Sequence, residues 1–274
     1  MLLLLFLLSS VFSFNYNVTQ NKLPVVLMHG ILSNQERMSD LQLYLETNFN
    51  IIVIVPEIGN GIVNSLNMPL YNMGEILCSE LNSNILLENG FNFIGISQGG
   101  ILGRYYIEVC GKYKVNNFIT LVSPHGGVYM KNIGDIIDVY GEYYQEHYSF
   151  SSYWRDPYNY NKYREIVLLA HLNNEAYEYN SMNKERFNSI NNFIMVYSSK
   201  DEILKPPESG KFSTFAINSM DVLSIEDTTI YKDLGLDKMF DSNKIHIYET
   251  NCTHSQHKEY DCFINLHSMF EKYC

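Results

Sequence analysis

The chain has 274 residues, of which 46% are hydrophobic and 18% are charged. These values are ordinary for a folded globular protein, so they exclude a disordered, collagen-like or coiled-coil chain. Nineteen Lys and Arg against thirty Asp and Glu give a net charge of -11. A surface this acidic repels phosphate backbones, which argues against nucleic acid as a partner.

The chain begins with an apolar run over residues 2–8, followed by small and polar residues up to Ser13. The run is too short to span a bilayer, and it fits a secretory signal peptide over residues 1–13. No Lys or Arg precedes Lys22, so a buried first helix or strand is the alternative. We expect residues 14–274 to form one domain, because no repeat, linker or charge block divides them.

Two further features agree with a secretory route. Five cysteines, at positions 78, 110, 252, 262 and 274, are compatible with two disulfides and one free thiol, and their spacing does not reveal the pairing. Asn17 and Asn251 each begin an Asn-x-Thr sequon for N-glycosylation. No second apolar run of about 18 residues occurs, which predicts a mature chain that is soluble or associates with membranes only transiently.

Six apolar runs rich in β-branched residues predict strands. They lie at residues 23–28, 51–55, 91–96, 118–122, 193–197 and 244–248. Stretches with helical spacing lie between the earlier runs, at residues 38–48, 73–87 and 101–112. Alternating strands and helices build a mostly parallel sheet that is covered on both faces, so the predicted fold class is α/β.

The alternation stops after the fourth predicted strand, and residues 124–190 form a long insertion. It holds half of the chain's 22 tyrosines and its only tryptophan, Trp154. Insertions of this size usually carry function, so we expect a cap over the carboxyl edge of the sheet, with Trp154 among the substrate-binding residues. The alternative is that these aromatic side chains only pack the insertion onto the core.

A Gly-x-Ser-x-Gly motif, Gly95 to Gly99, follows the third predicted strand and precedes a helical stretch. A sharp strand-to-helix turn leaves no room for β-carbons beside it, and it exposes the Ser97 hydroxyl at the start of a helix. The motif in this context predicts that Ser97 is a nucleophile. The alternative is a serine that only caps the helix.

A serine nucleophile needs a histidine base that is oriented by a carboxylate, and on this type of fold the acid and then the base follow the serine in the chain. Asp201 lies just after the fifth predicted strand, with Glu202 as its neighbouring alternative. His254 and His257 both follow the last predicted strand, and spacing does not separate them. Two other histidines, His246 in that strand and His267 in the terminal helix, are better explained by packing or surface roles.

Acyl transfer also needs backbone N–H groups that stabilise an oxyanion. One candidate is the amide of Gln98, the residue after the nucleophile, and the other is the amide of Ile31 in the loop after the first strand. His29 precedes a flexible Gly30 in that loop, and a hydrogen-bonded structural role is expected for it.

Several segments together resemble the palmitoyl-protein thioesterases of the lysosome, and the resemblance covers nearly all of residues 14–274. The segments are Pro24 to Gly30 (PVVLMHG), Gly95 to Gly100 (GISQGG), Tyr153 to Pro157 (YWRDP), Tyr163-Arg164, Leu169-Ala170, Phe193 to Pro206, Glu226 to Thr229 and Leu234 to Leu236. The stretch around Trp154 is the most specific, because α/β-hydrolases in general share only the serine motif.

The resemblance implies an α/β-hydrolase fold with a helical cap, and it assigns roles to particular residues. It places the nucleophile on Ser97, the acid on Asp201 rather than Glu202, and the base on His254 rather than His257. The sequence departs from the family pattern at two places. The family has Gly-Asp-His where this chain has Cys252-Thr253-His254, and the residue before the acid is Lys200.

The resemblance further places the oxyanion amides on Ile31 and Gln98, and it implies a disulfide between Cys78 and Cys110. The implied activity is hydrolysis of palmitoyl thioesters, with S-palmitoylated proteins or palmitoyl-coenzyme A as substrates. This chemistry calls for no metal and no cofactor, and the implied location is the lysosome or the cell exterior. The rival functions are an esterase or lipase for oxygen esters and a binding protein that has lost catalysis.

Overall fold

A six-stranded parallel sheet forms the centre of the molecule, with the strands in the order β2-β1-β3-β4-β5-β8. The computed structural model describes residues 22–274, so the expected signal peptide and the sequon at Asn17 lie outside the described residues. The six strands are β1 (Val25–Met28), β2 (Val53–Ile54), β3 (Phe91–Ile96), β4 (Val115–Leu121), β5 (Asn192–Ser198) and β8 (Ile245–Thr250).

Each apolar run predicted as a strand contributes one strand of this sheet, and all neighbouring pairs are parallel. The α/β fold class is therefore confirmed. The bounds of β3 agree with the prediction, whereas β2 is only two residues long. Strand β2 lies at the edge of the sheet and pairs only with β1.

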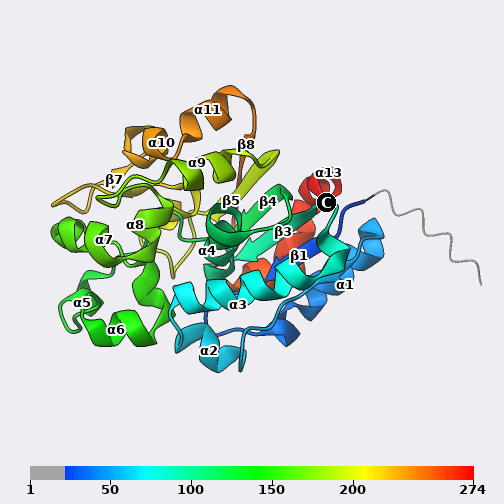
Figure 1. Ribbon diagram of the computed structural model, residues 1–274, viewed down its shortest axis with the longest axis horizontal. Helices are drawn as coiled ribbons and strands as arrows, with labels where there is room; N and C mark the ends of the chain where they lie inside the picture. The colour runs from blue at the N-terminus through cyan, green and yellow to red at the C-terminus, as the bar shows by residue number, and fades with distance from the viewer. Residues whose placement is uncertain (1–21) are drawn as a thin grey trace, which may run out of the picture.

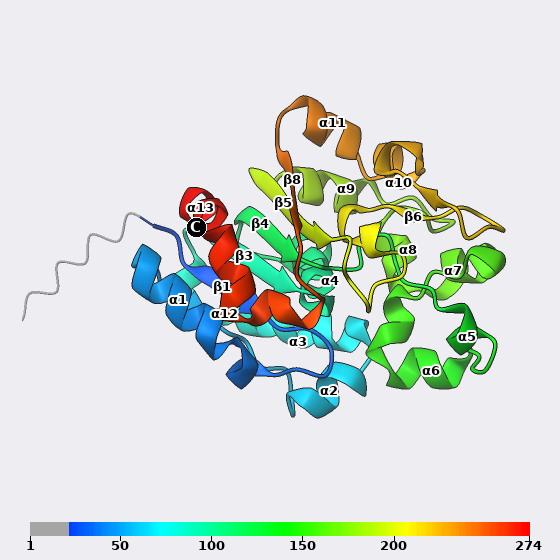
Figure 2. The same cartoon turned by 180° about the vertical axis from the view of Figure 1, so that it is seen from behind.

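Helices cover both faces of the sheet. Along β1, Val26 and Met28 join one apolar cluster, and Val25 and Leu27 join the other. The first cluster includes side chains of α3 (Leu70–Ser83), α4 (Gln98–Tyr105) and α9 (Ser181–Asn188), and the second includes those of α1 (Ser39–Phe49), α12 (Tyr260–Phe263) and α13 (His267–Tyr273). Figure 1 shows α3 and α4 in front of the sheet, and Figure 2 shows α1, α12 and α13 in front of it.

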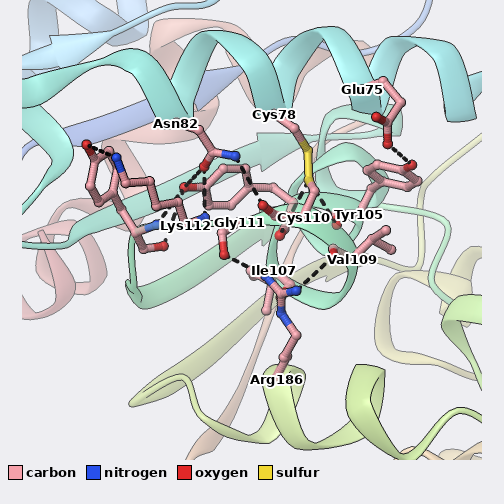
Figure 3. The surroundings of a disulfide bond; sticks show 12 residues. Glu75, Cys78, Asn82, Tyr105, Ile107, Val109, Cys110, Gly111, Lys112 and Arg186 are labelled. Carbon is pink, nitrogen blue, oxygen red and sulfur yellow. Dashed lines mark hydrogen bonds between the residues drawn. A yellow bond between two sulfur atoms is a disulfide. The ribbon is translucent and has the colours of Figure 1, made fainter.

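A disulfide joins α3 to the end of the segment that starts with α4. Cys78 and Cys110 are paired across a Cα–Cα distance of 6.1 Å, as the resemblance implied. Figure 3 shows Arg186 of α9 beside this bond, where its guanidinium donates to the carbonyls of Ile107 and Val109 at 3.1 and 2.8 Å. A cation that binds carbonyls at the end of a helix satisfies acceptors with no partner inside the helix.

The insertion at residues 124–190 contains four short α-helices before α9. They are α5 (Lys131–Gly134), α6 (Glu142–His147), α7 (Tyr160–Ile166) and α8 (Leu168–Leu172). These helices gather at one end of the molecule, at the left of Figure 1, beyond the carboxyl ends of the central strands. We call residues 124–190, the segment expected to form a cap, the cap.

A second excursion, between β5 and β8, was not predicted as a separate unit. It contains the hairpin of β6 (Thr214–Phe215) and β7 (Val222–Leu223) and the helices α10 (Ile230–Asp233) and α11 (Leu236–Asp241). The remaining helix, α2 (Ile62–Leu66), follows β2. Among residues 22–274 no helix combines the length and the apolar character needed to cross a bilayer.

A buried ion pair holds the cap insertion together. The Arg155 guanidinium donates to Glu175 at 2.8 Å, and the hydroxyl of Tyr163 donates to the other carboxylate oxygen at 2.6 Å. Burial alone raises the pKa of Glu175, but the charge of Arg155 and the donated hydrogen bonds lower it below its usual value. A buried carboxylate that is paired in this way stays charged and fixes the segment around Trp154.

Candidate active site

Ser97 lies at the turn between β3 and α4. Its backbone has φ 54° and ψ −124°, a conformation that is rare for a residue with a side chain. Its N–H donates to the Leu121 carbonyl of β4 at 2.8 Å, which ties the turn to the sheet. The Ser97 side chain does not cap α4, so the helix-capping alternative is wrong.

The glycines around Ser97 are required by close backbone contacts. A β-carbon on Gly95 would lie 2.5 Å from the Cα of Gly100, and one on Gly99 would lie 2.3 Å from the Met28 carbonyl oxygen. Real β-carbons do not approach backbone atoms this closely, so larger residues would displace α4 from the sheet. The glycines of the motif therefore allow the sharp turn that presents the Ser97 hydroxyl.

The structure brings Ser97, His254 and Asp201 together. The His254 Nε2 lies 2.9 Å from the Ser97 Oγ, and its Nδ1 lies 2.7 Å from the Asp201 Oδ2. Because a carboxylate only accepts, Nδ1 carries the proton and Nε2 is left to accept the proton of the Ser97 hydroxyl. Asp201 is 2% exposed and Ser97 8%, so the hydrogen-bond chain is largely shielded from water.

The loop after β5 fixes Asp201 and separates it from Glu202. The Asp201 Oδ1 accepts from the backbone N–H groups of Ile203 and Leu204 at 2.9 and 2.8 Å. The Glu202 carboxylate instead accepts from the backbone N–H of His254 at 2.9 Å. Glu202 thus holds the loop that carries His254 and does not contact its ring, and Lys200 is exposed to solvent.

His257 has a different role from His254. Its ring is fully buried, where Nε2 accepts from the Thr250 hydroxyl at 2.8 Å and Nδ1 donates to the Thr253 carbonyl at 2.9 Å. Burial lowers the pKa of His257, which keeps the ring neutral in this arrangement. Both ring nitrogens are used inside the loop, so His257 shapes the loop and does not reach Ser97.

A disulfide closes the same loop. Cys252 and Cys262, ten positions apart in the chain, are paired, and His254 lies inside the closed segment. The remaining cysteine, Cys274, is buried and unpaired within the part of the chain that the structure describes. The sequon residue Asn251 is exposed at the start of this loop.

The two amides expected to bind an oxyanion lie beside Ser97. Gln98 is the first residue of α4, so its N–H has no acceptor inside the helix. The Ile31 N–H follows Gly30, whose Cα packs so closely that an added β-carbon would lie 2.9 Å from the Ser97 β-carbon. Neither N–H has a protein acceptor among residues 22–274. Both amides are therefore available to a developing negative charge.

His29 has the structural role expected for it. Its Nε2 lies 3.1 Å from a carboxylate oxygen of Glu57, and its Nδ1 lies 3.0 Å from the Gly30 carbonyl. The other Glu57 oxygen accepts from the backbone of Gln35 at 2.7 Å. His29 thus stiffens the loop that presents the Ile31 amide.

An apolar cavity of about 350 Å³ adjoins Ser97 on the side of the cap. Trp154, the residue for which substrate binding was predicted, lines this cavity. The other lining residues come from the loops after β1, β4 and β5 and from the cap: Ile31, Leu32, Pro124, Val128, Met130, Ile133, Phe150, Tyr153, Ile203 and Leu204. No charged side chain lines the cavity, so it suits a hydrocarbon chain.

The Gln98 side chain links the turn at Ser97 to the cap, a role that the sequence analysis missed. Its Nε2 donates to the Ser65 carbonyl at 2.8 Å, and its Oε1 accepts from the Tyr153 hydroxyl at 3.1 Å. Ser149 of the cap donates to the same Ser65 carbonyl at 2.8 Å. A polar residue after the nucleophile was the only signal, and its partners lie far away in the chain.

The site contains no evident metal centre. Among the described residues 22–274, no group of three or more His, Cys, Asp or Glu side chains is placed to hold a metal ion. The polar groups of the site are a hydroxyl, an imidazole, a carboxylate and free amides, which is the set that acyl transfer through a serine uses.

Comparisons with known proteins agree with this geometry. A family model described as palmitoyl protein thioesterase matches residues 24–254. Palmitoyl-protein thioesterase 3 of Dictyostelium discoideum is 34% identical, over 85% of this chain and 86% of that protein. Lysosomal thioesterase PPT2-B of Xenopus laevis is 30% identical, over 82% and 83%. The mature form of the Bacillus licheniformis lipase BlEst2 superposes with a TM-score of 0.53 over 91% and 92% of the two chains, and its 11% identity supports the α/β-hydrolase fold alone. Because the family model matches residues 24–254 and the Dictyostelium relative matches most of the chain, this chain belongs to the palmitoyl protein thioesterase family.

Proposed function

We propose that this chain hydrolyses the thioesters of long-chain fatty acids, palmitate in particular, with Ser97, His254 and Asp201 as its catalytic triad. The observation that carries the proposal is the hydrogen-bond chain from Asp201 through His254 to Ser97, which lines an apolar cavity. Family membership supports the class of substrate.

The first half of the reaction forms an acyl-enzyme. The Ser97 Oγ attacks the thioester carbonyl while His254 Nε2 takes its proton, and the amides of Ile31 and Gln98 bind the resulting oxyanion. The carbon–sulfur bond then breaks, and the proton on Nε2 passes to the departing sulfur. Asp201 stabilises the imidazolium that exists between these two steps.

The second half releases the acid. A water molecule gives a proton to His254 Nε2 and attacks the acyl carbon, after which the bond to the Ser97 Oγ breaks and the serine regains its proton. A thiol with a pKa of about 8.5 leaves more easily than an alcohol, so the first step needs little help with the leaving group. Thioesters are therefore favoured over the oxygen esters that a lipase cleaves.

The apolar cavity supplies affinity for the acyl chain. Each buried methylene contributes about 0.8 kcal/mol, so a long chain gains much more than a short one. Trp154 and Tyr153 form part of the wall, and Leu32 and Ile203, at 52% and 45% exposure, lie where the cavity opens. These exposed apolar side chains support a transient contact with a membrane that holds the substrate.

We further propose the lysosome as the site of action. Relatives of this chain are named lysosomal thioesterases in frog and mouse. The signal peptide expected at residues 1–13, the sequons at Asn17 and Asn251, and the two disulfides fit the same route. S-palmitoylated proteins or peptides and palmitoyl-coenzyme A are the proposed substrates.

The test is the variant Ser97→Ala assayed on palmitoyl-coenzyme A and on a palmitoylated peptide. We expect loss of turnover by a factor of about 10⁴ or more, because the covalent route disappears. Ser83→Ala, an exposed serine at the end of α3, is the matched control. Undiminished turnover by Ser97→Ala would refute the proposal.

A second comparison separates a thioesterase from an esterase. The wild-type chain is assayed on a palmitoyl thioester and on an oxygen ester of the same acyl chain. The proposal predicts a higher kcat/KM for the thioester. A higher value for the oxygen ester would favour the lipase alternative.

A further inference from the structure

A second cavity, of about 290 Å³, adjoins the first one at Ser97. The two cavities share Ile31, Leu32, Ser97 and Ile203. The cap residues line only the first cavity, whereas His254 lines only the second. Ser97 thus lies at the junction of an apolar space beneath the cap and a space beside the base.

The chemistry of the proposed function determines which part of the substrate enters the second cavity. His254 must deliver a proton to the departing sulfur, so the sulfur has to lie on the side of His254. The acyl chain extends from the other side of the reacting carbon and enters the apolar cavity. The second cavity therefore receives the thiol half of the substrate.

The charged side chains that line this second cavity are all positive. The charged residues that line it are Arg37 and Lys258, and no carboxylate lines it. This is unusual in a chain with thirty acidic and nineteen basic residues. Neither cation forms an ion pair with a carboxylate within residues 22–274.

Arg37 keeps donors available for a ligand. One of its guanidinium nitrogens donates to the Leu32 carbonyl at 3.0 Å, which anchors the side chain beside the loop that carries the Ile31 amide. A guanidinium has five N–H donors, so most of them stay unused. Arg37 is exposed and Lys258 is half-buried, so both are accessible to a solute.

We propose that the second cavity selects thiol leaving groups that carry negative charge, with Arg37 and Lys258 as the residues that bind the anion. The proposal rests on the proposed function, because it concerns the leaving group of the same reaction. The shared chemistry is an anionic oxygen near the thiol. Its source is either the carboxylate of an acidic residue beside an S-palmitoylated cysteine or a phosphate of coenzyme A.

The test measures kcat/KM of the wild type and of the double variant Arg37→Gln/Lys258→Gln on four palmitoyl thioesters. Two substrates are anionic: palmitoyl-coenzyme A and a palmitoylated peptide with Glu on each side of the cysteine. Two are their neutral counterparts: the same peptide with Gln instead of Glu, and S-palmitoylpantetheine, which keeps the thiol arm of coenzyme A and lacks its phosphates. The readout is the ratio of kcat/KM for an anionic substrate to that for its neutral counterpart.

We expect the double variant to lower this ratio by about fivefold, the size of two exposed ion pairs, and to weaken its dependence on salt. A fall for the peptide pair alone identifies carboxylates as the anion, and a fall for coenzyme A alone identifies phosphate. The variant Arg37→Lys/Lys258→Arg keeps both charges and should keep the wild-type ratio. Lys238→Gln, an exposed lysine on α11, is the control for a lost charge elsewhere.

An unchanged ratio in the double variant would overturn the inference, as would an equal loss on anionic and neutral substrates. Failure of the proposed function looks different, because the wild type would then hydrolyse none of the four thioesters.

Discussion

The two sides of Ser97 are built in different ways. On one side, polar groups from the loops after β5 and β8 form a chain of hydrogen bonds of 2.7 and 2.9 Å. On the other side, the cap and three loops form an apolar cavity with Trp154 in its wall. The polar side positions protons, so it should control kcat, and the apolar side buries hydrocarbon, so it should control the dependence of kcat/KM on chain length.

The largest effect is expected on the polar side. Asp201→Asn should lower kcat by about 10⁴, because the amide no longer holds His254 in the tautomer that accepts from Ser97. Steady-state kinetics on palmitoyl-coenzyme A measure the change. The matched control is Glu202→Gln, the neighbouring acid, which contacts only the backbone of His254. An equal loss in both variants would contradict the assignment of Asp201.

A filled cavity tests the apolar side. Met130→Trp places a larger side chain in the cavity wall and should exclude part of a long acyl chain. Exclusion of two methylenes costs about 1.6 kcal/mol, or about 15-fold in kcat/KM for palmitoyl relative to butyryl thioesters. Met220→Trp, at an exposed position on the loop between β6 and β7, is the control. A uniform loss over all chain lengths would argue against an acyl site here.

The two disulfides allow a comparison between a crosslink close to the active site and a crosslink that only joins helices. Cys252–Cys262 encloses His254, whereas Cys78–Cys110 joins two helices away from the triad. Removing the first pair by double Cys→Ala substitution should lower kcat by about tenfold, since the loop with the base loses its closure. Removing the second pair should mainly lower the free energy of unfolding, by about 3 to 4 kcal/mol for a closed loop of 32 residues.

Kinetic assays and urea unfolding of both variants check this pair of expectations. A loss of kcat of the same size in the two variants would show that the position of the disulfide relative to His254 does not matter.

The smallest effect concerns the stability of the fold and the buried residues His125 and Arg104, which lie on the α4 side of the sheet. Burial and the nearby charge of Arg104 hold the pKa of His125 well below its ordinary value of 6.5. As the pH falls below 6.5 the unfolded chain therefore binds up to one more proton than the folded chain, so His125 lowers stability by up to about 1.4 kcal/mol per pH unit.

Glu108, which pairs with the same Arg104, acts in the opposite direction. Burial raises its pKa to about 7, so it favours the folded state at acidic pH and loses this contribution as the pH rises through 7. The informative measurement is urea unfolding of wild type and His125→Gln at pH 7 and pH 5. The variant should lose less stability on acidification, and an equal loss would contradict the role of His125.

Local sequence patterns predicted the sheet and the sharp turn at Ser97 because both depend on neighbouring residues. The run at 91–96 has the apolar pattern of a buried strand, and Gly95 and Gly99 fit only a turn in which the backbone approaches closely. The strands and helices between β5 and β8 were not predicted, because each is only two to six residues long. Such short elements have too few residues to show a period.

Residues brought together from distant parts of the chain were harder to predict. Spacing left His254 and His257 equivalent, and only the resemblance favoured His254. What separates them in the structure is contact with Asp201, which lies 53 residues earlier in the chain. The pairing of Cys252 with Cys262 and the grouping of Arg37 with Lys258 likewise depend on the folded loop and leave no local pattern.

The central claim is that the acyl group is transferred to the Ser97 Oγ and forms a covalent ester there before hydrolysis. The most direct test is to mix the wild-type protein with palmitoyl-coenzyme A, quench in acid within the first turnover, and locate palmitate by peptide mass mapping. The account predicts one palmitoyl ester on the peptide that contains Ser97, and none in Ser97→Ala. Palmitate release that proceeds in Ser97→Ala as fast as in the wild type, or an ester on another residue, would contradict it.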